Sequence, residues 1–86
     1  MQEKTEINSV QPLRALSMMV NKSVVVKLKA GRVLSGTLRF IDQCMNIVLD
    51  DAEELDTRTN QVIVRYGKVL IRGNQVLYIS ARNELE

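Results

Sequence analysis

The sequence predicts a mostly β protein, in which one short helix precedes a strongly bent antiparallel open barrel of five strands. Five strand-like runs follow one another along the 86 residues, separated by polar turns. Gly36 lies in the middle of the run over residues 33–41, where a strongly curved strand needs a residue without a side chain. Because aromatic residues make up only 3% of the chain, burial must come from aliphatic side chains, which suit strands and subunit contacts.

The first predicted element is a short helix that begins at Pro12, a residue that suits the first turn of a helix. Residues 1–10 are polar and without periodicity, so we expect a flexible tail there. The apolar residues after Pro12 recur at helical spacing: Leu13, Leu16, Met19 and Val20. We expect this helix to end near Asn21 and its apolar stripe to cover an open end of the barrel.

Two strands joined by a turn come next. Residues 23–28 alternate, so that one face carries Val24, Val26 and Leu28. Residues 29–32 turn the chain, and residues 33–41 form a strand that is long enough to bend. Such curvature lets a small sheet close.

Three further strands are predicted after a polar loop at residues 42–46. The first runs to residue 55, beginning apolar and becoming acidic, as a strand does when its far half extends beyond the core. Residues 56–60 form a polar connector, and residues 61–71 resume the strand pattern with a bulge or bend at Gly67. Residues 76–80 close the series.

Charges are segregated along the chain. The formal net charge of +2 is too small to indicate nucleic-acid binding by itself. Residues 22–39 contain only basic charges, whereas residues 50–56 contain only acidic ones. The acidic run lacks the glycine-spaced pattern of a cation site, so we interpret it as a solvated strand end.

The composition argues against an enzyme and against a metal or cofactor site. The chain has no histidine, and its one cysteine, Cys44, has no candidate base nearby in the sequence. With neither disulfides nor a metal available, oligomerisation is the remaining way to stabilise so small a domain. The sequence shows no signal-peptide pattern and no apolar run of membrane-spanning length, so we expect a soluble, cytoplasmic protein.

Two polar segments between predicted strands contain the candidate binding residues. In the loop at residues 42–46, short polar side chains can bond to the turn backbone, while Met45 is expected in the core. In the turn at residues 72–75, Gly73 can adopt a positive φ and Asn74 tolerates the left-handed region, which leaves Arg72 at the tip.

Together with Gly31 and Gly36, these two loops resemble the paired Sm1 and Sm2 motifs of the Sm and Sm-like (LSm) RNA-binding proteins, most closely the archaeal ones. The resemblance runs from Pro12 to Ser80. It implies an Sm-like domain of the SH3-like barrel class at residues 11–81, with Sm1 at about 22–55 and Sm2 at about 62–80 and a short tail at 82–86. It also implies a homo-oligomeric ring, seven subunits being favoured over six, in which the fourth strand of one subunit pairs with the fifth strand of the next.

In that family both loops face the central pore and hold single-stranded, uridine-rich RNA. Carried over by position, Arg72 stacks on a base, Asn46 reads the uracil edge, Asp42 orients the loop and Gly73 supplies backbone contact. Two positions depart from the family pattern. Cys44 replaces the histidine or aromatic residue that would cover the other face of the base, and Asn74-Gln75 replaces a pair whose asparagine commonly follows one place later.

The resemblance implies a role in RNA processing, RNA stability or ribonucleoprotein assembly, with proteins of RNA processing or decay as further partners. An alternative is a ring scaffold that acts mainly through protein partners, because the RNA pocket is altered at Cys44. In that case Lys22, Arg32 and Arg39 could bind RNA phosphates outside the pore, in a manner sensitive to salt and tolerant of sequence.

Overall fold

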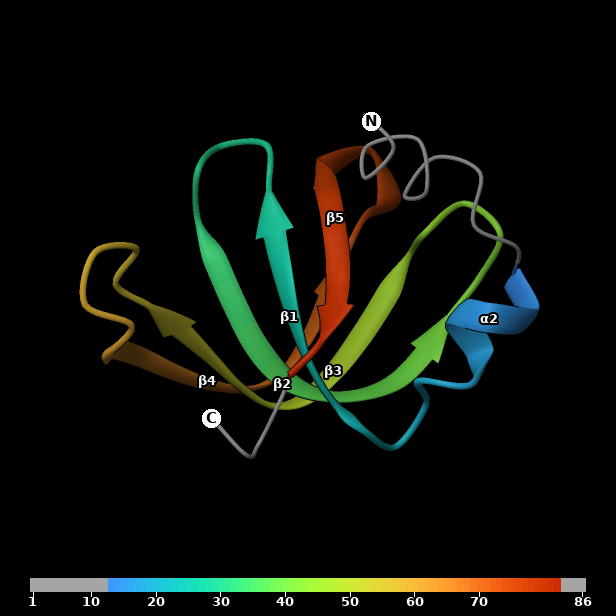
Figure 1. Cartoon of the computed structure of the whole chain (residues 1–86), viewed down its shortest axis with the longest axis horizontal. Coiled ribbons are helices and arrows are strands. Elements are labelled where there is room, and N and C mark those ends of the chain that lie inside the picture. Colours follow the sequence, from blue (N-terminus) through green and yellow to red (C-terminus); the bar gives the residue numbers. More distant parts are fainter. Residues whose placement is uncertain (1–12, 83–86) are drawn as a thin grey trace.

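The computed structural model describes residues 13–82 and contains one short helix and one five-stranded sheet that bends strongly around its core (Figure 1). The helix is α2 (Leu13–Ser17), and a 3-10 turn (Gly73–Gln75) lies between the last two strands. The strands are β1 (Ser23–Leu28), β2 (Val33–Ile41), β3 (Ile47–Leu55), β4 (Val62–Ile71) and β5 (Val76–Ala81). The predicted fold class is therefore confirmed. Pro12, the predicted N-terminal tail and all but the first residue of the predicted C-terminal tail lie outside the described residues.

The sheet is antiparallel throughout, in the order β4-β3-β2-β1-β5. Consecutive strands therefore pair as neighbours except for β4 and β5, which lie at opposite edges. The 72–75 turn is thus not a hairpin tip: it carries the chain from one edge of the sheet to the other.

The core lies on the concave face of the bent sheet. Period-two alternation in β1 buries Val24, Val26 and Leu28, as the pattern predicted. A continuous buried row crosses three strands, because Ile41 pairs with Ile47 and Ile47 pairs with Ile71. This row brings the end of β2, the start of β3 and the end of β4 to one place.

Two glycines allow the curvature. A Cβ atom at Gly36 would lie 2.9 Å from the carbonyl oxygen of Asp50, so only glycine lets β3 approach β2 this closely. Gly67 has a φ of +85°, and the register between β3 and β4 shifts there. The predicted bend at Gly36 and the predicted bulge at Gly67 are both confirmed.

The helix is shorter than predicted. α2 ends at Ser17 and residues 18–21 form turns, whereas the apolar spacing predicted a helix that continues to about Asn21. The N–H of Asn21, at a φ of +72°, instead donates to the carbonyl of Leu38 on β2. A tertiary hydrogen bond thus ends the helix early. Leu16 is buried in the core, and Met19 and Val20 pack against it.

Candidate nucleic-acid interface

The two polar loops meet at one end of the buried row. The loop at residues 42–46 connects Ile41, at the end of β2, to Ile47, at the start of β3, and the 72–75 turn begins directly after Ile71. Because Ile47 pairs with both Ile41 and Ile71, the loop and the turn lie side by side. An open hollow of about 470 Å³ lies between them. It is lined by five of the six predicted site residues, Cys44, Asn46, Arg72, Gly73 and Asn74. Asp42, the sixth, is bonded to Asn46.

The carboxylate of Asp42 organises its own loop. Its Oδ1 accepts the backbone N–H groups of Cys44 and Asn46, both at 2.9 Å, and its Oδ2 accepts the side-chain N–H of Asn46 at 3.1 Å. The hydrogen bonds from Asn46 favour the charged carboxylate and hold the pKa of Asp42 below its usual range. The loop geometry is therefore fixed by Asp42.

Asn46 joins the two loops. Its Oδ1 accepts the backbone N–H of Gly73 at 2.8 Å, while its Nδ2 donates to Asp42. An amide has two N–H donors and two acceptor lone pairs, so one N–H and one lone pair remain. Because both loops hold the amide, its orientation is fixed, and Asn46 lines the hollow.

The role expected for Gly73 has to be corrected. Gly73 was predicted to use a positive φ, but the residue begins a 3-10 turn and is not among the glycines with positive φ. Glycine is required for a different reason: a Cβ atom here would collide with the carbonyl group of Cys44, whose carbon would lie only 2.8 Å away. The two loops touch, backbone against backbone, at Gly73.

Arg72 is exposed, in extended conformation, and its guanidinium has no partner among the described residues. It is therefore free to bind a ligand at the hollow. Gln75 points elsewhere: it lines another hollow beside Leu28, and its carbonyl accepts the N–H of Lys29 at 2.9 Å. Of the Asn74-Gln75 pair, only Asn74 lines the hollow between the loops.

Cys44 and Met45 occupy different environments. The Cys44 thiol is exposed at the hollow, whereas Met45 is partly buried against the core, as predicted. Among the described residues, no aromatic side chain lines the hollow, so this part of the chain offers no aromatic cover for a base that stacks on Arg72.

We expect acid to weaken the hydrogen bonds of the loop at residues 42–46, because it protonates the Asp42 carboxylate that accepts them. Its pKa is lowered from an ordinary 3.8 in the folded protein, so its carboxylate stabilises the fold above that pH and this contribution disappears as the pH falls through the folded-state pKa. We expect Asp42→Asn to be less stable than wild type at neutral pH and the difference to shrink below pH 3.8 in urea unfolding. Asp51→Asn, which removes a carboxylate outside the loop, is the matched control. A difference that stays constant down to pH 2 would contradict this role.

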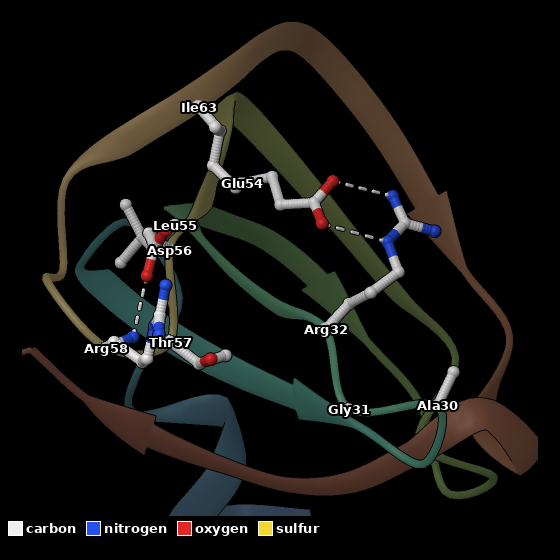
Figure 2. Close-up of a pocket in the computed structure, with 9 residues that line it drawn as sticks. All are labelled: Ala30, Gly31, Arg32, Glu54, Leu55, Asp56, Thr57, Arg58 and Ile63. Atoms are coloured by element: carbon white, nitrogen blue, oxygen red, sulfur yellow. Dashed lines mark hydrogen bonds and ion pairs between the residues drawn. The ribbon is translucent and has the colours of Figure 1, made fainter.

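Four basic residues outside the hollow form ion pairs with carboxylates, namely Arg32, Arg39, Arg65 and Lys68. Arg39 donates to Asp50 at 2.7 Å and to Asn21 at 2.6 Å. Figure 2 shows the guanidinium of Arg32 facing the carboxylate of Glu54, with N–O distances of 3.2 and 3.0 Å, beside a hollow of about 310 Å³ between two turns. The acidic run is therefore not simply solvated.

Sequence reasoning missed these ion pairs, because their partners are far apart in the chain and are brought together only by the strand register. Arg65 likewise pairs with Glu53 at 3.0 Å.

Among the described residues, no helix is long and apolar enough to cross a membrane.

Comparisons with known proteins agree with this geometry. The sequence profile of the LSM domain matches residues 14–81. An snRNP Sm-like protein of Methanococcoides burtonii is 43% identical over 70 residues, which cover 81% of this chain and 94% of the relative. The U6 snRNA-associated Sm-like protein LSm6 of Eremothecium gossypii is 48% identical over 67 residues, which cover 76% of this chain and 79% of the relative.

Two solved structures share the fold. The Sm protein of Pyrococcus abyssii, in complex with a uridine heptamer, superposes with a TM-score of 0.76 at 40% identity, covering 84% of this chain and 99% of that one. A heptameric archaeal Sm protein superposes with a TM-score of 0.73 at 36% identity, covering 81% and 98%.

Proposed function

The chain belongs to the LSM domain family of Sm-like proteins, and on that premise we propose that it forms a ring that holds single-stranded, uridine-rich RNA at its central pore. The family resemblance drawn from the two loop motifs is thereby confirmed. The similar archaeal structures are a heptamer and a complex with a uridine heptamer, which supports a ring of seven here. We assign the domain to residues 11–81.

The observation that carries the proposal is the fixed amide of Asn46 beside the free guanidinium of Arg72. The remaining Nδ2 proton can donate to a uracil carbonyl while the remaining Oδ1 lone pair accepts uracil N3–H. The Arg72 plane can stack on the same base. Asp42 orients the amide, and Gly73 and Asn74 complete the wall of the site.

This function needs no catalysis and no cofactor: the site binds and orders RNA. In the cell such a ring would act in RNA processing, RNA stability or ribonucleoprotein assembly, in the cytoplasm and with protein partners of those processes.

One observation favours the scaffold alternative, namely that Cys44, and no aromatic side chain of the described chain, lines the hollow together with Arg72. The lateral RNA route is less favoured, because Arg32 and Arg39 already pair with carboxylates and only Lys22 among those three lacks a side-chain partner in the described chain.

The test is fluorescence anisotropy with labelled all-U and all-A heptanucleotides at one fixed salt concentration. We expect tighter binding of the U heptamer by about tenfold or more, since a bidentate contact to a base edge discriminates by about 1–3 kcal/mol. Cys44→His should raise the U affinity further, because stacking on an aromatic is worth about 1–3 kcal/mol per base. Equal, weak binding of both RNAs by wild type and variant would rule out a uridine pocket and favour the scaffold.

A further inference from the structure

The site between the two polar loops has no net formal charge, although its proposed ligand is a chain of phosphates. Of the six site residues only Arg72 and Asp42 carry a formal charge, and the charges of +1 and −1 cancel. In the proposed complex the Arg72 guanidinium stacks on a base, and the amide of Asn46 binds the edge of that base. Because the base occupies both groups, the two loops leave the RNA phosphates without a cation of their own.

A third segment, the turn at residues 29–32 between β1 and β2, adjoins this site. The backbone N–H of Lys29 donates to the carbonyl of Gln75 at 2.9 Å, so the 29–32 turn is bonded to the end of the 72–75 turn. The 72–75 turn is itself bonded to the loop at residues 42–46. The three segments lie along the upper edge of the molecule in Figure 1. A side chain at Lys29 is therefore a neighbour of the site.

Lys29 is a cation at this junction without a partner. It is exposed, and no hydrogen bond or ion pair holds its ammonium group among the described residues. Arg32, in the same turn, is different, because its guanidinium forms two hydrogen bonds with the carboxylate of Glu54. Of these two basic residues, Lys29 is the one that is available to an anionic ligand.

The position of Lys29 brings its ammonium group within reach of the hollow. Residues that face each other across an antiparallel hydrogen bond have Cα atoms about 5 Å apart, and Lys29 faces Gln75 in this way. The residue before Gln75 is Asn74, which lines the hollow. Since lysine carries its charge on a flexible four-carbon stem, the ammonium group can bind a phosphate beside the hollow.

We propose that Lys29 is a phosphate contact of the RNA that is held between the two loops. Its ammonium is a compact charge that binds a phosphate oxygen, while Arg72 and Asn46 bind the base. A phosphate contact adds affinity without reading sequence. The inference rests on the proposed function and deepens it, because it assigns base recognition to the two loops and backbone attraction to the 29–32 turn.

Salt-dependent binding tests the proposal. Anisotropy would measure the affinity of wild type and Lys29→Ala for all-U and all-A heptanucleotides over a series of salt concentrations. Each phosphate contact of a single strand changes the slope of log affinity against log salt by about 0.7, which is about fivefold between about 1 M and about 0.1 M salt. Because the contact would repeat in several copies of the ring, we expect Lys29→Ala to lose at least about tenfold in affinity at about 0.1 M salt. The loss should be equal for both RNAs, and the salt slope should become shallower.

Two variants serve as matched controls. Lys29→Arg keeps a cation at the end of a long side chain, so it should keep the affinity and the salt slope close to those of wild type. Lys22→Ala removes an exposed lysine directly before the start of β1, whereas Lys29 directly follows its end, so the two lie about 20 Å apart along the strand. At that distance the charge is screened, and Lys22→Ala should change the affinity by less than about twofold. Light scattering should give the wild-type mass for all three variants.

The outcomes separate this proposal from the proposed function. Unchanged affinity and slope in Lys29→Ala, an equal loss in Lys22→Ala, or a changed mass of Lys29→Ala would each overturn the phosphate contact. A lower U-to-A ratio in Lys29→Ala would also overturn it, since Lys29 would then act on the base. In all of these cases a preference of wild type for U would leave the pore site standing. Wild type that binds both RNAs weakly and equally would overturn the proposed function and the phosphate contact together.

Discussion

Arg72→Ala is expected to abolish most of the affinity for a uridine heptamer while leaving the ring intact. Arg72 lines the hollow between the two loops and its exposed side chain has no partner in the described chain, so its guanidinium is available to stack on a base. Stacking contributes about 1–3 kcal/mol per base, and in the proposed ring the loss would repeat at each subunit. We therefore expect a loss of at least about a hundredfold by anisotropy, at about 1.4 kcal/mol per factor of ten.

Two further variants separate stacking from charge. Arg72→Lys keeps the cation but lacks the planar guanidinium, so it should bind with intermediate affinity and with a weaker preference for U over A. Arg65→Ala removes an exposed cation of β4 that pairs with Glu53, and should leave U binding within about twofold of wild type if the effect is local. An equal loss from Arg65→Ala would point to general electrostatic attraction instead of a pocket.

Gly73→Ala is expected to disrupt the site from within. The new methyl group would collide with the carbonyl of Cys44, so the two loops must move apart. Separation would break the hydrogen bond from the Gly73 N–H to Asn46 and release the Asn46 side-chain amide from its fixed orientation. Overpacking of this kind destabilises a fold by about 1–3 kcal/mol. We expect this loss in urea unfolding together with loss of detectable U binding.

Gly31→Ala is the control for the general effect of replacing glycine. Gly31 has a φ of +93°, and a Cβ atom there would meet no other atom within 4 Å. Its substitution should therefore be destabilising through the left-handed backbone alone, by about 1–2 kcal/mol. Gly31 lies outside the hollow between the two polar loops. Binding of the U heptamer at temperatures well below the unfolding temperature should therefore persist. If Gly73→Ala bound the U heptamer like wild type, contact between the loops would not be what fixes the site.

The elements that the sequence predicted well are those governed by local pattern. Alternation and β-branched content placed strands at residues 23–28 and 33–41, with the bounds that the structure has. The bends at Gly36 and Gly67 were also readable, because a glycine within a strand has few other uses. The six proposed site residues stand in two short polar loops whose motif spacing is local.

The features that only the tertiary structure decided depend on register between distant strands. The sequence by itself determined which residues form strands and which form the two loops. The pairing of Arg39 with Asp50, and of Arg32 with Glu54, arises because bent neighbouring strands bring separated charges together. The bond from Gly73 to Asn46 is of the same kind, as is the backbone contact that makes glycine necessary there. Such contacts are set by how five strands close around one core, and no local pattern specifies that geometry.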